Sequence, residues 1–98
     1  FITRIMNNIV SGIFTVKDGR LYDFLRMLDE TENIRIEPSA CAGFIAPINL
    51  TKYKELEQYC MEHNLSLDKL QNTTHIVWAT GGNLVPENIM EQYLNTAL

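Results

Sequence analysis

The sequence is short of basic residues and contains no long apolar run. Its 98 residues hold eight Lys and Arg against twelve Asp and Glu, which gives a formal net charge of −4. This negative balance argues against nucleic acid or an anionic membrane surface as a partner. No apolar stretch approaches the length of a membrane span, and the first residues lack the pattern of a secretory signal. We therefore expect a cytoplasmic protein.

Cysteine is also scarce, and the motifs of several enzyme classes are missing. Cys41 and Cys60 have neither CxxC spacing nor a nearby ligand cluster, so we expect reduced packing residues and no metal site. No Walker-type lysine follows the glycines, and no catalytic triad motif is recognisable. The chain begins at Phe1 without an initiator Met, which is expected of a processed product or of a piece of a longer protein.

What the sequence does contain is helical periodicity. The clearest case covers residues 20–32, where Leu21, Phe24, Leu25 and Leu28 fall at i, i+3, i+4 and i+7. Asn33 is expected to end this helix, because asparagine tolerates the left-handed conformation. Similar reasoning predicts further helices over residues 1–10, 40–46, 51–64 and 86–94.

Residues of particular types mark the expected ends of these helices. Short polar side chains that can cap a helix N-terminus stand at Asp18, Ser39 and Thr51. Pro86 suits the first position of the last helix, where its missing N–H costs nothing. Pro47 is expected to end or kink the helix over residues 40–46.

Short stretches rich in β-branched and aromatic residues predict strands at residues 12–16, 34–36 and 75–79. Each predicted strand is followed by a helix, so the element order is α-β-α-β-α-α-β-α. This alternation predicts an α/β fold with a partial parallel sheet of about three strands covered by helices. Because so thin a sheet is unusual, we expect residues 1–98 to be a single fragment of a larger domain.

Polar residues and glycines follow two of the predicted strands. Glu37 comes after residues 34–36, and Thr80 with Gly81 and Gly82 comes after residues 75–79. Ligands of open α/β sheets lie beyond the carboxyl ends of the strands, so the Glu37 carboxylate and the Thr80 hydroxyl are predicted to share one crevice. The paired glycines permit positive φ and close approach of another group. On spacing alone a structural threonine in a turn is the simpler interpretation. For Glu37, a surface carboxylate or a partner for a helix N-terminus is an equal alternative.

Several stretches, taken together, lie in register with one known family. They are Ile34–Ala40 with Ala42, Gly43 and Pro47, then Asn72–Gly82, and then Val85–Glu87 with Met90–Leu94. The register continues upstream through Arg4, Met6, Gly12, Thr15, Asp18, Tyr22 and Asp23. In these residues the chain resembles the C-terminal end of the D-serine dehydratase family. The resemblance is weakest between Ile48 and Leu70, and Asn83 and Leu84 stand where the family has a third glycine and a methionine.

The resemblance implies a lyase that uses pyridoxal 5′-phosphate and has fold type II, the fold of tryptophan synthase β and of serine and threonine dehydratases. It implies α,β-elimination of D-serine to pyruvate and ammonia. Thr80 is implied to hydrogen-bond the pyridine nitrogen of the cofactor, with Gly81 and Gly82 shaping the pocket and Glu37 lying near the cofactor. The lysine that forms the aldimine and the glycine-rich phosphate loop are implied to lie upstream.

The chain is thus expected to be the C-terminal part of the large, cofactor-binding domain, and to hold no catalytic residue of its own. Its expected partners are the substrate D-serine and the remainder of its own polypeptide. Two alternatives stay open. One is a dehydratase of the same fold that acts on another hydroxy amino acid, and the other is a free-standing small α/β module that binds a ligand at the Thr80–Gly82 turn.

Overall fold

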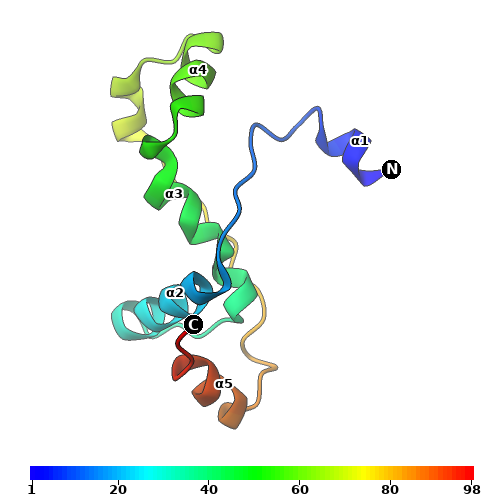
Figure 1. Ribbon diagram of the computed structural model, residues 1–98, viewed down its shortest axis with the longest axis vertical. Coiled ribbons are helices and arrows are strands. Elements are labelled where there is room, and N and C mark those ends of the chain that lie inside the picture. Colours follow the sequence, from blue (N-terminus) through cyan, green and yellow to red (C-terminus); the bar gives the residue numbers. More distant parts are fainter.

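The computed structural model describes the backbone of residues 1–98 and every side chain except those of Thr51 and Leu67. Its regular elements are all helical (Figure 1). In chain order, with η for a 3₁₀ helix, they are α1 (Ile2–Met6), α2 (Asp18–Glu32), η1 (Pro38–Phe44), α3 (Ile45–Asn49), η2 (Leu50–Lys52), α4 (Lys54–Glu62), η3 (Leu67–Asn72) and α5 (Glu87–Leu94). None of these described helices is both long and apolar enough to cross a membrane.

The predicted α/β fold with a three-stranded parallel sheet is wrong. Residues 12–16, 34–36 and 75–79 run as extended chain between the helices (Figure 1), and no backbone hydrogen bond joins these segments in the described structure. A strand needs a neighbouring strand to pair with its N–H and C=O groups, and a β-favouring composition cannot supply that neighbour. Ile76 and Trp78, expected in a buried strand, are 87% and 81% exposed.

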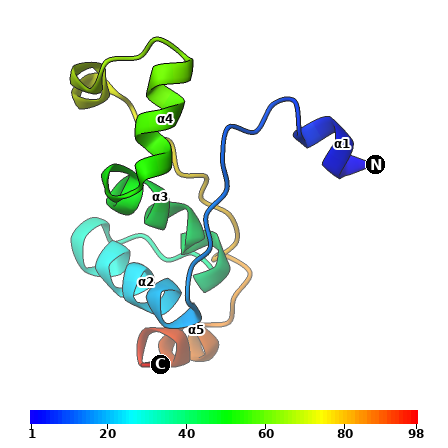
Figure 2. The same ribbon diagram turned by 45° about the horizontal axis from the view of Figure 1, so that its top comes forward.

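The hydrophobic core lies where α2, η1 and α5 meet, and Figure 2 shows α2 and α5 packed side by side. Its buried members come from these helices, from the start of α3 and from the extended segment before η1. They are Phe24, Leu25, Ile36, Cys41, Ile45 and Met90. The core therefore anchors the segment that carries Glu37 between two helices from opposite ends of the chain.

Helix α2 confirms the clearest helical prediction. Phe24 and Leu25 of the predicted apolar stripe are buried, and Leu28 packs against the same cluster. Asn33 ends the helix in the left-handed conformation with φ of 54°, as expected from its side chain. The N-cap is Lys17 and no side chain caps the helix, so the prediction of Asp18 as the cap is wrong.

The helix predicted over residues 40–46 begins earlier and ends later than expected. It starts as η1 at Pro38, after Glu37 rather than Ser39 at the N-cap position, and continues into α3. Pro47 lies in the first turn of α3 and does not end it. The first-turn N–H groups of an α-helix have no partner within the helix, so proline is tolerated there.

The remaining helices are shorter than predicted. Only α1 forms within residues 1–10, and α4 occupies the middle of residues 51–64 before Asn64 turns left-handed with φ of 54°. Thr51, the expected cap, has a side chain outside the described part of the structure. Pro86 is the N-cap of α5 instead of its first residue, and its carbonyl accepts the N–H groups of Ile89 and Met90.

The chain as a whole is more open than a compact domain. Its radius of gyration is 16.2 Å, whereas about 13 Å is usual for this length. Its accessible surface is 8024 Å², against about 5,700 Å² for a compact protein of this mass. Figures 1 and 2 show α1 standing apart at the end of an extended segment, where Phe1 and Ile13 are 96% and 89% exposed.

Candidate functional site

The structure brings Glu37 and Gly81 into direct contact. A Cβ atom on Gly81 would lie 2.7 Å from the Glu37 Oε1 atom and 2.7 Å from its Cγ atom. Gly81 also has φ of 69°, a conformation that side chains with a Cβ rarely adopt. The carboxyl group of Glu37 thus occupies the space that any other residue at position 81 would need. The segments that carry Glu37 and the glycine turn therefore meet without a sheet edge, and a shared crevice for the Glu37 carboxylate and the Thr80 hydroxyl stays a prediction.

Gly82 is held still more tightly, against the backbone of the segment before Glu37. Its φ is 93°, and a Cβ atom there would lie 3.0 Å from the Cα atom of Ile36 and would overlap the carbonyl oxygen of Arg35. Ile36 is itself a buried core residue, 4% exposed. The glycine turn is thus seated on backbone that the core already fixes.

Two local features bring the residues of the turn to this place. Upstream, a Cβ atom on Gly43 of η1 would lie 2.9 Å from the Cγ1 atom of Val77, so Val77 packs closely on that helix. Downstream, the Val85 N–H donates to the Gly82 carbonyl at 3.1 Å, which closes a turn just before Pro86, the N-cap of α5. The turn is therefore held from both sides.

We call the place where Glu37 and the backbone of Arg35 and Ile36 meet Gly81 and Gly82 the junction. Thr80 lies next to it in the chain, with its side chain exposed. Its hydroxyl makes no hydrogen bond with any other residue whose side chain the structure describes. A threonine hydroxyl can donate one hydrogen bond and accept others, so Thr80 keeps its full capacity for an incoming group. The roles of Thr80, Gly81, Gly82 and Glu37 toward a cofactor stay predictions.

Arg35 is the residue of this region that its sequence pattern did not predict. Its Nε atom lies 2.8 Å from Oδ1 of Asp29 in α2, and its Nη1 atom lies 2.9 Å from Oε1 of Glu87 in α5. A hydrogen bond and the charge of Asp29 raise the pKa of Arg35 above its ordinary value. The signal in the sequence is one arginine between Ile34 and Ile36, which shows its partners only once α2 and α5 are placed.

Cys41 lies behind the junction in the core, where it is fully buried. Burial raises the pKa of its thiol to about 11, because the thiolate would lose its hydration there. The Sγ atom lies 3.7 Å from the Glu37 carbonyl oxygen, within reach of a weak S–H hydrogen bond. Cys41 is thus a neutral packing group beneath Glu37, and both cysteines are unpaired, as expected.

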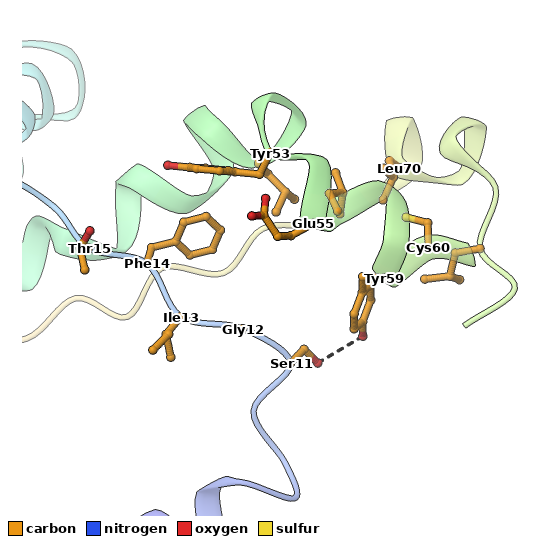
Figure 3. A pocket seen from close by; sticks show the side chains of 13 residues that line it. Ser11, Gly12, Ile13, Phe14, Thr15, Tyr53, Glu55, Tyr59, Cys60 and Leu70 are labelled. Carbon is orange, nitrogen blue, oxygen red and sulfur yellow. Dashed lines mark hydrogen bonds between the residues drawn. The ribbon is translucent and has the colours of Figure 1, made fainter. Parts of the chain in front are cut away.

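A separate hollow of about 700 Å³ lies between residues 11–15 and α4, and is shown in Figure 3. The hydroxyl oxygens of Ser11 and Tyr59 are 3.2 Å apart across it, and the ring of Phe14 meets that of Tyr53 edge-on at 5.4 Å. Its lining is mostly apolar and includes no Lys, Arg or predicted site residue. The hollow is therefore separate from the predicted cofactor residues Thr80, Gly81, Gly82 and Glu37.

Among the described residues, no lysine and no metal-binding group of side chains lies at the junction. All four lysines are exposed on helix ends and short helices elsewhere, at Lys17, Lys52, Lys54 and Lys69. Among the described residues, no group of three His, Cys, Asp or Glu side chains is arranged to hold a metal ion. What the junction offers is a hydroxyl, a carboxyl group and a glycine turn.

Sequence comparison shows what the chain is similar to. Over 95 residues, 97% of the chain, it is 50% identical to a probable D-serine dehydratase of Fusobacterium nucleatum. It is 44% identical over 97 residues to a probable D-serine dehydratase of Colwellia psychrerythraea, and 41% identical over 97 residues to a D-serine dehydratase of Yersinia enterocolitica. The Colwellia and Yersinia matches cover 99% of the chain, and all three matches cover 21% of the relative's length. No protein-family model matches the chain. The resemblance drawn from the motifs is confirmed.

Proposed function

We propose that this chain is the C-terminal part of the cofactor-binding domain of a D-serine dehydratase, an ammonia-lyase that converts D-serine to pyruvate and ammonia. The observation that carries the proposal is 41–50% identity to such enzymes over nearly every residue of the chain. The chain spans about one fifth of the length of these relatives. The activity is therefore proposed for the whole polypeptide.

The open shape of the chain supports its place within a larger protein. The accessible surface of 8024 Å² exceeds the value for a compact protein of this mass by about 2,300 Å². Stable interfaces cover about 800 Å² on each partner, so the excess is large enough for extensive packing against other parts of one polypeptide. The alternative of a free-standing small α/β module is not supported, because the regular elements are helical and the chain is not compact.

The residues of the junction fit one edge of a pyridoxal-phosphate site. Thr80 has an exposed hydroxyl without a partner in the described structure, and the carboxyl group of Glu37 lies against the glycine turn beside it. The bound cofactor supplies an electron sink for loss of the substrate α-proton and β-hydroxyl. In this proposal Thr80 donates a hydrogen bond to the unprotonated pyridine nitrogen, since a hydroxyl does not protonate that nitrogen as a carboxylic acid would.

Residues outside the 98 complete the site in this proposal. The four lysines are exposed on elements other than the junction, so the lysine that carries the cofactor is assigned to the rest of the polypeptide. The chain alone is then inactive, and its contribution is to bind and orient the ring. The two unpaired, buried cysteines fit a cytoplasmic location, where thiols stay reduced.

The decisive experiment uses the full-length protein, assayed for pyruvate release from D-serine, L-serine and D-threonine. We expect D-serine to be preferred, and a preference for another of these amino acids would assign the enzyme a different substrate. Thr80→Asp should shift the absorption of the bound cofactor and lower the elimination rate, whereas Thr74→Asp, at an exposed position on the same extended segment, should do neither. An unchanged spectrum and rate in Thr80→Asp would remove Thr80 from the site.

A further inference from the structure

Arg35 lies at the point where three separate pieces of the chain meet. Its carbonyl oxygen fills the space beside Gly82 that a side chain would otherwise occupy, so the Arg35 backbone supports the glycine turn. Two residues further on, Glu37 covers Gly81. One short segment thus contacts both glycines, and Arg35 is the residue within it whose side chain leaves the junction.

The Arg35 side chain ties that segment to both helices of the core. It contacts Asp29 in α2 at 2.8 Å and Glu87, the first residue of α5, at 2.9 Å, while Glu91 one turn later lies 3.9 Å away. Helix α5 begins directly after the turn that Gly82 and Val85 close. Arg35 therefore holds the turn from two sides, by its backbone at Gly82 and by its guanidinium at the helix that follows.

The charge balance at this contact depends on one residue. Three carboxylates, from Asp29, Glu87 and Glu91, surround a single guanidinium. Without the positive charge, α2 and the start of α5 would present only like charges to each other, and like charges at close range repel. Two N–H donors of the same planar guanidinium bind carboxylates on different helices. A lysine cannot reproduce this arrangement, because its single ammonium group stands at the end of a flexible side chain.

We propose that Arg35 is a positioning residue, which fixes the Gly81–Gly82 turn, and with it Thr80, relative to Glu37. The expected effect on the reaction rate rests on the proposed function, whereas the expected effect on the position of the turn does not. Loss of the guanidinium leaves the turn attached to the chain and frees it to move against Glu37. A displacement of about 1 Å at a group that orients a reacting molecule can lower a rate by up to a hundredfold.

The matched control is Arg26, an arginine that also joins α2 to the end of the chain. Its guanidinium donates to the carbonyl oxygens of Leu94 and Thr96 and pairs with Asp23. It connects the same two helical regions as Arg35, but none of its hydrogen bonds or ion pairs in the described structure reaches the glycine turn. A general loss of stability should therefore appear in both Arg26→Gln and Arg35→Gln, whereas a displaced turn should appear only in the latter.

The test compares these two variants and Arg35→Lys in the full-length protein, first by hydrogen exchange at the Val85 amide, without reference to activity. We expect Arg35→Gln to speed exchange of that amide roughly tenfold relative to Arg26→Gln, with Arg35→Lys between Arg35→Gln and the native protein. Glu87→Gln, which removes one partner, should speed exchange by a smaller factor and serves if Arg35→Gln does not fold. Equal exchange in the variants of Arg35 and Arg26 overturns the proposal.

The second readout is the cofactor and the reaction. Arg35→Gln should shift the absorption of bound pyridoxal phosphate and lower kcat for D-serine roughly tenfold, with KM changed less than twofold, while Arg26→Gln leaves the spectrum unchanged. One outcome separates the two proposals. If Arg35→Gln exchanges faster but the native protein neither binds pyridoxal phosphate nor eliminates D-serine, the positioning role is supported and the proposed function is refuted. Faster exchange with an unchanged spectrum and kcat in an active enzyme would overturn the assignment of Arg35 to the site.

Discussion

Three glycines of this chain should respond to alanine in a fixed order, Gly82 most, Gly81 less and Gly12 least. At Gly82 two costs combine. A left-handed backbone costs an L-residue roughly 1–2 kcal/mol, and forcing atoms into filled space costs about 1–3 kcal/mol more. The atoms in the way are the backbone of Arg35 and Ile36, which cannot rotate aside. We therefore expect Gly82→Ala to lower the free energy of unfolding by about 2–5 kcal/mol.

At Gly81 the overlapping atoms belong to the flexible side chain of Glu37, which can turn away. The expected loss for Gly81→Ala is then mainly the backbone strain of about 1–2 kcal/mol. Gly12 has no atom within 4 Å of the new Cβ and no positive φ. Gly12→Ala is expected to be neutral or to stabilise by up to about 1 kcal/mol, since alanine restricts the unfolded chain.

The assay is urea unfolding of the full-length protein, with a common slope used to convert midpoints into free energies. A double-mutant cycle separates the two causes at Gly81. Glu37→Ala removes the overlapping atoms, so Gly81→Ala should cost less in that background, whereas Gly82→Ala should cost the same with or without Glu37. A Gly82→Ala protein as stable as Gly12→Ala would refute the close packing of the turn on Arg35.

Three further predictions concern single residues. The pKa of Cys41 is raised to about 11 from an ordinary 9.0, so the contribution of its buried thiol to stability is complete below pH 9.0 and is lost as the pH rises to about 11. Across that range the free energy of unfolding should fall more steeply in the native protein than in Cys41→Ala. Parallel curves would contradict the burial of the thiol. Trp78 is 81% exposed, so acrylamide should quench its emission in the isolated chain about as efficiently as it quenches free tryptophan, and a protected indole would contradict its placement. Asn33→Ala should destabilise α2 by about 1 kcal/mol and Asn33→Gly by close to zero, because of the left-handed backbone at that position; a reversed order in thermal unfolding would count against this ending of the helix.

Local features of the fold were predictable from the sequence because their causes are local. The spacing of Phe24 and Leu25 identifies the buried face of α2. Asn33 marks its end for a reason that lies within a single residue, the tolerance of asparagine for positive φ. Boundaries failed where neighbours decide them, as at Pro38, where the helix starts two residues before its predicted beginning.

The sheet was not predictable because a strand is a relation between segments. Residues 75–79 have the composition of a buried strand, and their prediction as one assumed a partner that the described chain does not contain. The exposed positions of Ile76 and Trp78 follow from the same absence, since side chains on an extended segment are covered only by what lies beside it. The composition of a segment shows that it could pair with a neighbouring strand, but it does not show whether such a strand is present.

The candidate site also has features that depend on single residues and features that depend on contacts between distant segments. The conformational freedom of Gly81 and Gly82 is visible in the sequence, and the structure uses it at φ of 69° and 93°. A shared sheet edge was expected to bring the Glu37 carboxylate and the Thr80 hydroxyl together. The contacts in the structure are instead between Glu37 and Gly81, and between Gly82 and the backbone of Arg35 and Ile36. The sheet edge was wrong as the cause, and a shared crevice for Glu37 and Thr80 stays a prediction.

Arg35 is where that difference matters most for function. A sheet edge would fix the turn by many backbone hydrogen bonds, so that no single side chain could release it. In the observed arrangement one guanidinium, bound to Asp29 and Glu87, links the turn's following helix to the segment that carries Glu37. Both ion pairs are partly exposed, so their strength falls with rising ionic strength. Salt should therefore speed exchange at the Val85 amide in the native protein and leave it unchanged in Arg35→Gln, a difference that a turn held by backbone pairing would not show.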